Sequence, residues 1–326
     1  MHRRRALAAL AAASAAIAAP WARAQPAFPS RPIRIVVPFG PGGIADLTAR
    51  AVGKELSESL KQSVVIENRP GAGGVTAGDL VARAEPDGHT LLLMSNGTAV
   101  SAGLFRKLPF DAQKDFAPIS LLGTFDIAVL VAENARFKTL ADLLAHAKAN
   151  PGKLNIATVA VGSTQNLAAE LFKTTAGLDA QVVPFNGTPA VITALRGGEV
   201  DAAVEILGPV KTQITGKALR ALAVLGDKRP VGLGDVPTAA ETGGALAGFN
   251  VASWNALAAP AGTPRPVIER LQRETQAALA SAELKQQLAA LSLEARSSTP
   301  EQLATLLASE IRRWTQVIER AKIPRQ

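Results

Sequence analysis

The first clear pattern of hydrophobic and polar positions lies between residues 33 and 60. Residues Ile33 to Val37 are rich in β-branched residues, as a buried strand requires, and the turn Pro38–Gly43 follows them. After the turn, apolar residues recur at helical spacing, at Ile44, Leu47, Ala51, Leu56 and Leu60. A strand that turns directly into a helix leaves backbone N–H groups free in a field of partial positive charge. The pattern therefore predicts an anion site at this turn.

The same alternation continues along the chain. Before residue 120 it predicts strands at 33–37, 64–67 and 90–94 and helices near 43–60 and 74–84, a pattern typical of a parallel sheet covered on both faces. A polar turn is expected at 95–98. The alternation restarts with helices at 139–149, 166–175 and 189–196 and strands at 154–158, 181–185, 200–204 and 219–225. The remainder is expected to be helical, at 265–280, at 283–291 and in a last amphipathic helix with Leu303, Leu307, Ile311, Trp314 and Ile318 on one stripe.

Two long apolar runs, Ile119–Val131 and Val251–Ala259, separate these groups of elements. We interpret them as strands that cross between two α/β domains, the first made of residues 25–123 and 253–326 and the second of residues 124–252. Two such domains form a hinged cleft, and ligands of open α/β sheets bind beyond the carboxyl ends of the strands. The sequence therefore predicts a ligand cleft between two domains.

Residues 1–24 have the pattern of a secretory signal peptide. A basic start, Met-His-Arg-Arg-Arg, precedes an Ala/Leu run and a small-residue cleavage region, so we expect cleavage after Ala24 and a mature protein in the periplasm. The apolar run is too short and weak for a membrane span. The arginine run is compatible with either the general secretory or the twin-arginine route.

Charge and cysteine content narrow the function classes. The formal charge is +8, with 35 Lys and Arg against 27 Asp and Glu, and the signal peptide contains four of the arginines and no acid. The remaining excess near +4 forms no Lys/Arg block and no stripe interleaved with aromatic residues, so we expect no nucleic-acid partner. The absence of cysteine excludes disulfides, thiol nucleophiles and cysteine metal sites.

One interpretation of the first turn is a dinucleotide site. Gly40, Gly42 and Ala45 match the spacing G-x-G-x-x-A after a strand, and Glu67 ends the next strand at about the expected distance. Two prolines stiffen the turn, however, and an exported protein meets little nicotinamide cofactor. An exported, nucleotide-dependent oxidoreductase therefore remains an alternative function. Apart from that alternative, no cofactor is predicted.

The second interpretation is a carboxylate clamp between two helix N-termini. Gly42 and Gly43 lie at the first, and Gly162, Ser163 and Thr164 lie at an equivalent turn in the second domain. Neither turn contains Lys or Arg, and backbone N–H groups and hydroxyls suit a receptor that must later release its ligand. Each turn taken alone is also consistent with ordinary turn geometry and capping.

Catalytic machinery is hard to assemble from this sequence. The mature histidines are His89, beside a turn, and His146, within a helix, so a serine–histidine–acid relay would need one of them in the cleft. Glu205 and Asp46 are the carboxylates nearest to strand ends or turns. No His/Asp/Glu cluster has the spacing of a metal site, and we expect neither metal nor enzyme activity.

Several motifs follow one another in order over essentially the whole mature chain: Pro38-Phe39-x-Pro41-Gly42-Gly43-x-x-Asp46, residues 67–74, 86–92, 108–111, 114–118, 184–190, 235–241 and 259–264, and Trp314. Together they resemble the Bug family, the periplasmic solute receptors of the tripartite tricarboxylate transporter type. The resemblance implies a two-domain periplasmic binding protein of type II, a Venus-flytrap fold, that closes on one small organic carboxylate. It also implies delivery to membrane transporter subunits by a monomer; a role in sensing for a signalling partner is the alternative.

The resemblance also implies where the ligand binds. The expected ligand-binding residues are Phe39, Gly42, Gly43, Ile44, Ala45, Asp46, Ser95, Thr98, Gly162, Ser163, Thr164, Asn166, Phe185, Asn186, Gly187 and Glu205. The chain departs from the family pattern at three places, with Asn166 for a usual His, Phe185-Asn186 for Tyr-Lys, and Glu205 for Asp. These positions shape the far end of the ligand, which is expected to be a dicarboxylate or an aromatic acid.

Overall fold

The structure, a computed structural model, describes residues 28–230 and 232–326. The predicted signal peptide and its cleavage point lie outside these residues. The described strands are β1 (Ile33–Val37), β2 (Val64–Asn68), β3 (Thr90–Ser95), β4 (Phe116–Ala132), β5 (Leu154–Val159), β6 (Ala180–Phe185), β7 (Ala202–Ile206), β8 (Leu219–Val224), β9 (Ala252–Pro260) and β10 (Leu293–Ala295). The α-helices are α2 (Ile44–Leu60), α3 (Val75–Ala82), α4 (Asn96–Leu104), α5 (Leu140–Ala149), α6 (Thr164–Thr175), α7 (Thr188–Gly197), α8 (Leu207–Thr215), α9 (Arg265–Ala280), α10 (Ala282–Ala290) and α11 (Pro300–Arg320).

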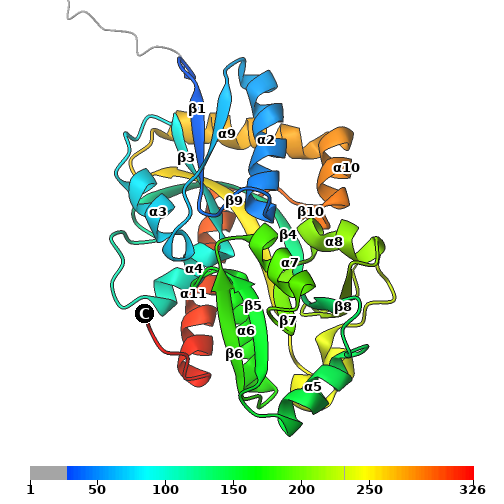
Figure 1. The fold of residues 1–326 in the computed structure, drawn as a ribbon. Helices are drawn as coiled ribbons and strands as arrows, with labels where there is room; N and C mark the ends of the chain where they lie inside the picture. Colours follow the sequence, from blue (N-terminus) through cyan, green and yellow to red (C-terminus); the bar gives the residue numbers. More distant parts are fainter. Residues whose placement is uncertain (1–27, 231) are drawn as a thin grey trace, which may run out of the picture.

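The strands form two sheets that share β4, and we call each sheet with its helices a lobe. The first lobe contains β2, β1 and β3 as parallel neighbours, with β9 antiparallel between β3 and β4. The second contains β6, β5 and β7 as parallel neighbours, with β7 and β8 antiparallel to β4. Figure 1 shows the N-terminal elements, in blue, beside α9 and α10, in orange, in one half, and the green elements in the other. The fold is α/β with a mixed sheet.

Strand β4 connects the two lobes. Its residues 116–126 pair with β9, and residues 127–132 pair with β7 and β8. The chain returns to the first lobe just before β9, where the Val251 N–H donates to the Leu225 carbonyl at 2.7 Å. The crossing strand predicted at residues 119–131 thus lies at the junction, and β9 begins there.

Two helices next to the junction differ from the sequence predictions. The pattern predicts a turn at residues 95–98, but they begin α4, because the Ser95 hydroxyl accepts from the Gly97 N–H and the Thr98 hydroxyl accepts from the Ser95 N–H, at 3.1 and 3.4 Å. The pattern does not predict helix α8, since Gly208 and Pro209 break the apolar run; proline is tolerated in a first helical turn.

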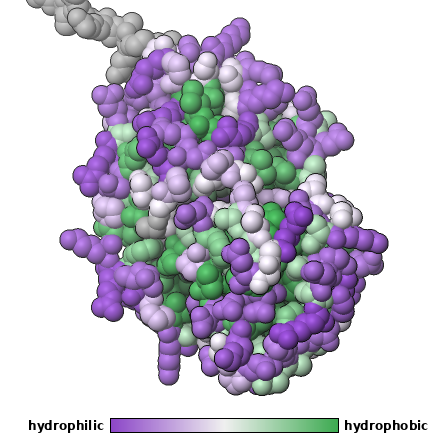
Figure 2. Space-filling view, viewed as in Figure 1, coloured by the Kyte–Doolittle hydropathy of each residue, from purple (hydrophilic) through white to green (hydrophobic). Residues whose placement is uncertain are grey.

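Buried apolar clusters form the core of the two lobes. One large apolar cluster fills the first lobe and continues into the second, where it includes residues of α5, β5, α6 and β7. A smaller cluster lies between β4, α7 and α8 in the second lobe. Helix α11 buries Leu303, Leu307, Trp314 and Ile318 and packs on α4 and β4. The face in Figure 2 is mostly hydrophilic with scattered apolar residues. No helix in the described part of the chain has the length and hydropathy to cross a membrane.

Candidate functional site

A cavity lies between the lobes, at the ends of the strands where the helices begin. The empty space in it, including the part open to solvent, is ≈ 410 Å³. Its lining is Phe39, Gly40, Gly43, Ile44, Ala45, Ser95, Phe125, Val159, Thr164, Gln165, Gly187, Thr188, Ile206, Ser253 and Asn255. None of these residues is charged, so the cavity offers a ligand hydroxyls, carboxamides, backbone groups and apolar surface.

Five helices begin at this cavity. The N-cap or first residues of α2, α4, α6, α7 and α8 are all part of the lining: Gly43 and Ile44, Ser95, Thr164 and Gln165, Gly187 and Thr188, and Ile206. The first N–H groups of a helix have no partner within it, and each N-terminus has roughly half a positive charge. The cavity is therefore electropositive without a cationic side chain, which suits an anion.

The turn before α2 is held in shape by two side chains. The Asp46 carboxylate accepts from the Gly42 N–H at 3.0 Å, and the Asn68 carboxamide donates to the Phe39 carbonyl at 2.9 Å. Gly42 has a φ of 83°, a conformation that glycine adopts without strain. Because Asp46 takes up the Gly42 N–H, the groups left for a ligand are those of Gly43 and the residues after it.

Asp46 is itself buried, at 3 % exposure, and forms an ion pair with Arg50 at 2.9 Å. Burial alone would raise the pKa of Asp46, but the bonds from Arg50, the Gly42 N–H and Asn68 outweigh it and lower the pKa below its ordinary range. Asp46 therefore stays ionised and acts on the turn, and it does not line the cavity.

The matching turn in the second lobe is also fixed internally. The Ser163 hydroxyl donates to the Val159 carbonyl and accepts from the Asn166 N–H, both at 3.1 Å, so it caps α6. The Asn166 carboxamide donates to Thr158 at 3.3 Å. The next residues, Thr164 and Gln165, are the ones that reach the cavity.

Glu205 lies in β7 behind the cavity and is fully buried. One carboxylate oxygen accepts from the Gln165 carboxamide at 2.9 Å and from the Ile206 N–H at 2.7 Å, while the other has no hydrogen-bond partner among the described residues. Burial raises the pKa of Glu205 to about 7, although bonds from Gln165, the Ile206 N–H and Thr188 oppose this. All three of these neighbours line the cavity, so Glu205 connects the starts of α6, α7 and α8.

The predicted site residues fall into two groups. Those that line the cavity are Phe39, Gly43, Ile44, Ala45, Ser95, Thr164 and Gly187. Those that do not are Gly42, Asp46, Thr98, Gly162, Ser163, Asn166, Phe185, Asn186 and Glu205; several of them, such as Ser163 and Thr98, cap helices instead. Sequence reasoning missed Gly40, Phe125, Val159, Gln165, Thr188, Ile206, Ser253 and Asn255. Polar residues at alternate positions of an apolar strand, as at Ser253 and Asn255, would have indicated a face turned toward a site.

The lobes touch around the cavity through small residues. The Ser253 hydroxyl donates to that of Thr164 at 3.2 Å, joining β9 to the start of α6. On one side Gly73 and Gly162 are so close that a β-carbon on Gly73 would lie 2.7 Å from the Gly162 Cα. On the other, a β-carbon on Gly208 would lie 1.8 Å from the Leu291 carbonyl oxygen. The two lobes are thus in direct contact on both sides of the cavity.

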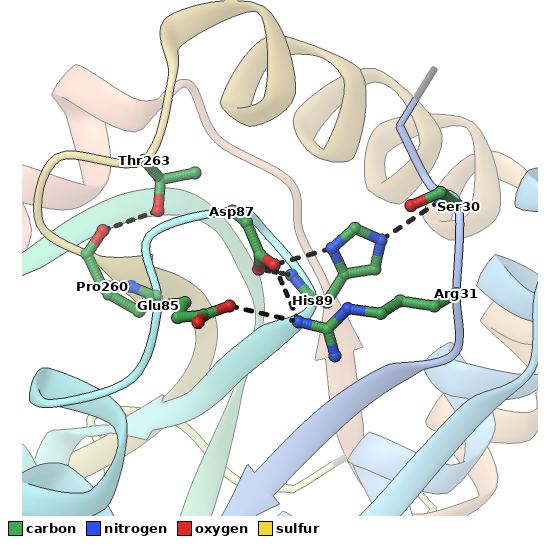
Figure 3. A network of polar contacts seen from close by, with 7 residues as sticks. All are labelled: Ser30, Arg31, Glu85, Asp87, His89, Pro260 and Thr263. Carbon is green, nitrogen blue, oxygen red and sulfur yellow. Dashed lines mark hydrogen bonds and ion pairs between the residues drawn. The ribbon is translucent and has the colours of Figure 1, made fainter. Parts of the chain in front are cut away.

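Neither of the two histidines among the described residues lines the cavity. His89 is buried in the first lobe, where its Nε2 accepts from the Ser30 N–H at 3.2 Å and its Nδ1 lies 3.3 Å from Asp87, as Figure 3 shows. His146 lies on α5 beside Arg136. Among the described residues, no group of three or more His, Cys, Asp or Glu could hold a metal ion.

Glu67, the acid of the dinucleotide interpretation, lies in β2. It forms ion pairs with Arg34, at 3.0 Å, and with Arg69. Its carboxylate is thus engaged within the protein.

Sequence comparisons match the chain to one family over most of its length. The model of the tripartite tricarboxylate transporter family receptor matches residues 48–323. A UPF0065 protein in the tcbD-tcbE intergenic region of Pseudomonas sp. strain P51 is 39% identical, over 90% of this chain and 87% of that protein. Protein BugT of Bordetella pertussis is 36% identical, over 89% of each chain.

Solved structures of similar proteins share the fold. Rpa4515 of R. palustris, described with adipate, is 32% identical with a TM-score of 0.87 and covers 91% of this chain and 99% of its own. MatC of Rhodopseudomonas palustris, described with bound malate, is 34% identical with a TM-score of 0.85, at 89% and 100% coverage. The periplasmic binding protein BugD is 30% identical with a TM-score of 0.88, at 92% and 100% coverage. The two-lobed α/β fold, the cavity at converging helix N-termini and these matches agree, and the chain belongs to the tripartite tricarboxylate transporter receptor family, to which the Bug proteins are related.

Proposed function

We propose that the protein is a periplasmic solute receptor that binds one small organic carboxylate between its lobes. Hinge motion closes the lobes on the ligand, and the monomeric closed receptor delivers the ligand to a membrane transporter. The proposed lobes comprise residues 25–123 with 253–326, and residues 124–252. The protein is not an enzyme in this proposal, and it reaches the periplasm through its signal peptide.

The observation that supports the carboxylate is the convergence of five helix N-termini on a cavity without charged lining residues. Backbone N–H groups bind carboxylate oxygens strongly in a site shielded from water. A cation would need acidic partners, and the described lining provides no acidic side chain. The names of Rpa4515 with adipate and of MatC with malate support the same class of ligand.

The experiment places a negative charge in the cavity without disturbing the fold. Ser95 caps α4, and Asp is an equally good N-cap, so Ser95→Asp keeps the cap and adds a carboxylate to the lining. Repulsion at about 5 Å in a partly buried site weakens carboxylate binding by about 100-fold. Ser281→Asp is the matched control, because Ser281 caps α10 in the same way and does not line the cavity.

The ligand is identified first by native mass spectrometry of gently purified protein. Thermal shift then ranks mono-, di- and tricarboxylates and aromatic acids, and calorimetry gives dissociation constants for both variants. Unchanged affinity in Ser95→Asp would contradict the anion site, and turnover of the bound acid would contradict the receptor role. Uptake of the identified acid by cells with and without the gene separates transport from sensing.

A further inference from the structure

Asn255 is a polar residue of the cavity lining that lies in a strand and not at a helix N-terminus. It lies in β9, lines the cavity and is 1 % exposed. Its neighbour two residues away, Ser253, also lines the cavity, so the same face of β9 points there. The question is which end of its carboxamide meets the ligand.

Hydrogen bonding fixes the orientation of this carboxamide. The Thr48 hydroxyl donates its single hydrogen to the Ile44 carbonyl at 2.7 Å. In its contact with Asn255 the Thr48 hydroxyl can therefore only accept a hydrogen bond. The carboxamide nitrogen of Asn255 is the donor, at 3.1 Å from the Thr48 hydroxyl oxygen. The carboxamide oxygen is the polar end left for the cavity.

This oxygen is buried and has no donor among the described residues. A buried acceptor without a donor weakens the complex, and an ionised carboxylate cannot serve it, because carboxylate oxygens only accept. A ligand that satisfies both the helix N-termini and Asn255 needs a carboxylate and, beside it, a hydrogen-bond donor.

We propose that the cavity selects a hydroxycarboxylate, with the Asn255 oxygen accepting from its hydroxyl and Thr48 positioning Asn255. This inference rests on the proposed function. A hydroxyl is favoured over an ammonium group, because the described lining has no carboxylate to pair with a cation and five helix N-termini would repel it.

The test uses pairs of acids that differ by one hydroxyl: lactate and propionate, malate and succinate, mandelate and phenylacetate. Calorimetry on the wild-type protein should give a dissociation constant at least about tenfold lower for the hydroxy acid of the pair that binds best. Equal affinities within that pair overturn the selection while leaving a carboxylate receptor intact. Tighter binding of the matching amino acid, aspartate in place of malate, overturns the choice of hydroxyl. Binding of no acid at all overturns the proposed function and this inference together.

Substitution of Thr48 tests the positioning role. Thr48→Val removes the acceptor, so the carboxamide is free to turn its nitrogen toward the cavity, where it suits a carboxylate oxygen. The preference for the hydroxy acid should fall by about fivefold or more, whereas Thr48→Ser keeps both hydrogen bonds and the wild-type preference. A preference unchanged in a folded Thr48→Val protein overturns the role of Thr48. If that variant does not fold, the wild-type comparison still decides the selection.

Discussion

Gly208 provides the sharpest test of closure. It is the second residue of α8, in the second lobe, and a β-carbon there would lie 1.8 Å from the Leu291 carbonyl oxygen in the first lobe. It would also lie 3.4 Å from Ile44 Cδ1, at the edge of the cavity. Because the nearest atom is backbone, it cannot rotate away. In Gly208→Ala the lobes must therefore stay apart by more than about 1 Å relative to this structure.

The two states of the receptor should respond differently. Overpacking of this size costs about 1–3 kcal/mol, and under the proposed hinge motion only the closed state meets the clash, so the dissociation constant should rise about 10-fold to 100-fold. In the open, ligand-free state that the proposal implies, the variant gains a better helix former, worth up to about 1 kcal/mol. Its melting temperature should be unchanged or about 2 °C higher.

Calorimetry, thermal melts with and without ligand, and small-angle scattering measure these effects. The variant should show weaker binding and less compaction with ligand, at an unaltered ligand-free melting temperature. Gly197→Ala is the control, since this α7 glycine is in the same lobe and its β-carbon would be 3.8 Å from the nearest atom, in the Glu199 side chain. Wild-type affinity in Gly208→Ala, or a ligand-free protein destabilised by several degrees, would refute closure through this contact.

Three further substitutions test other parts of the site. Burial raises the pKa of Glu205 to about 7, so ionisation of Glu205 destabilises the fold as the pH rises from about 4.5 to 7. By denaturant titration, Glu205→Gln should be more stable than wild type by about 3 kcal/mol at pH 8 and equally stable near pH 4. A stability difference that does not depend on pH would contradict this. The pKa of Asp46 is lowered in the folded protein, so Asp46→Asn should be less stable than wild type at pH 7. This difference should disappear as the pH falls through the folded-state pKa of Asp46. Equal stability at pH 7 would show that the ion pair with Arg50 does not stabilise the fold. Ser253→Ala removes the buried bond to Thr164 and should raise the dissociation constant about fivefold, and an unchanged value would mean that this bond has no part in closure.

Elements with a long regular pattern were predictable from the sequence. Strand β1, helix α2 and the amphipathic helix α11 appear where hydrophobic periodicity predicted them, because burial of one face decides their conformation. Helix α4 was missed because its start contains asparagine and glycine, which favour turns in isolation. In the fold the Asn96 oxygen accepts from Trp314 Nε1 at 3.0 Å, a contact 218 residues away that no local pattern contains.

The candidate site was predictable in position and only partly in detail. The turn before α2 was correctly placed as a start of a helix at the cavity, since its glycines and prolines interrupt both the strand before it and the helix after it. At the start of α6 the predicted ligand-binding residues were Ser163, Thr164 and Asn166. Thr164 lines the cavity together with Gln165, which was not predicted, whereas the Ser163 side chain caps the helix and folds back onto the backbone. Asn255 lay within a run that was interpreted only as a crossing strand. Its importance depends on Thr48, 207 residues away, and therefore on tertiary structure.

In the proposed receptor, one set of groups recognises the charge of the ligand and another set determines which acid fits. In the proposed receptor the charge of the ligand is met by backbone N–H groups at five helix N-termini, whose positions depend on the fold and hardly on side-chain identity. Glu205 is the described acid that connects three lining residues, and an ionised Glu205 would repel a carboxylate. Burial raises the pKa of Glu205 to about 7, so a carboxylate bound in the proposed site would raise this pKa further, and its binding would take up a proton near neutral pH. Substitutions among the lining side chains can therefore change which acid fits the cavity. Binding of the carboxylate by the helix N-termini, and proton uptake by Glu205, would stay the same.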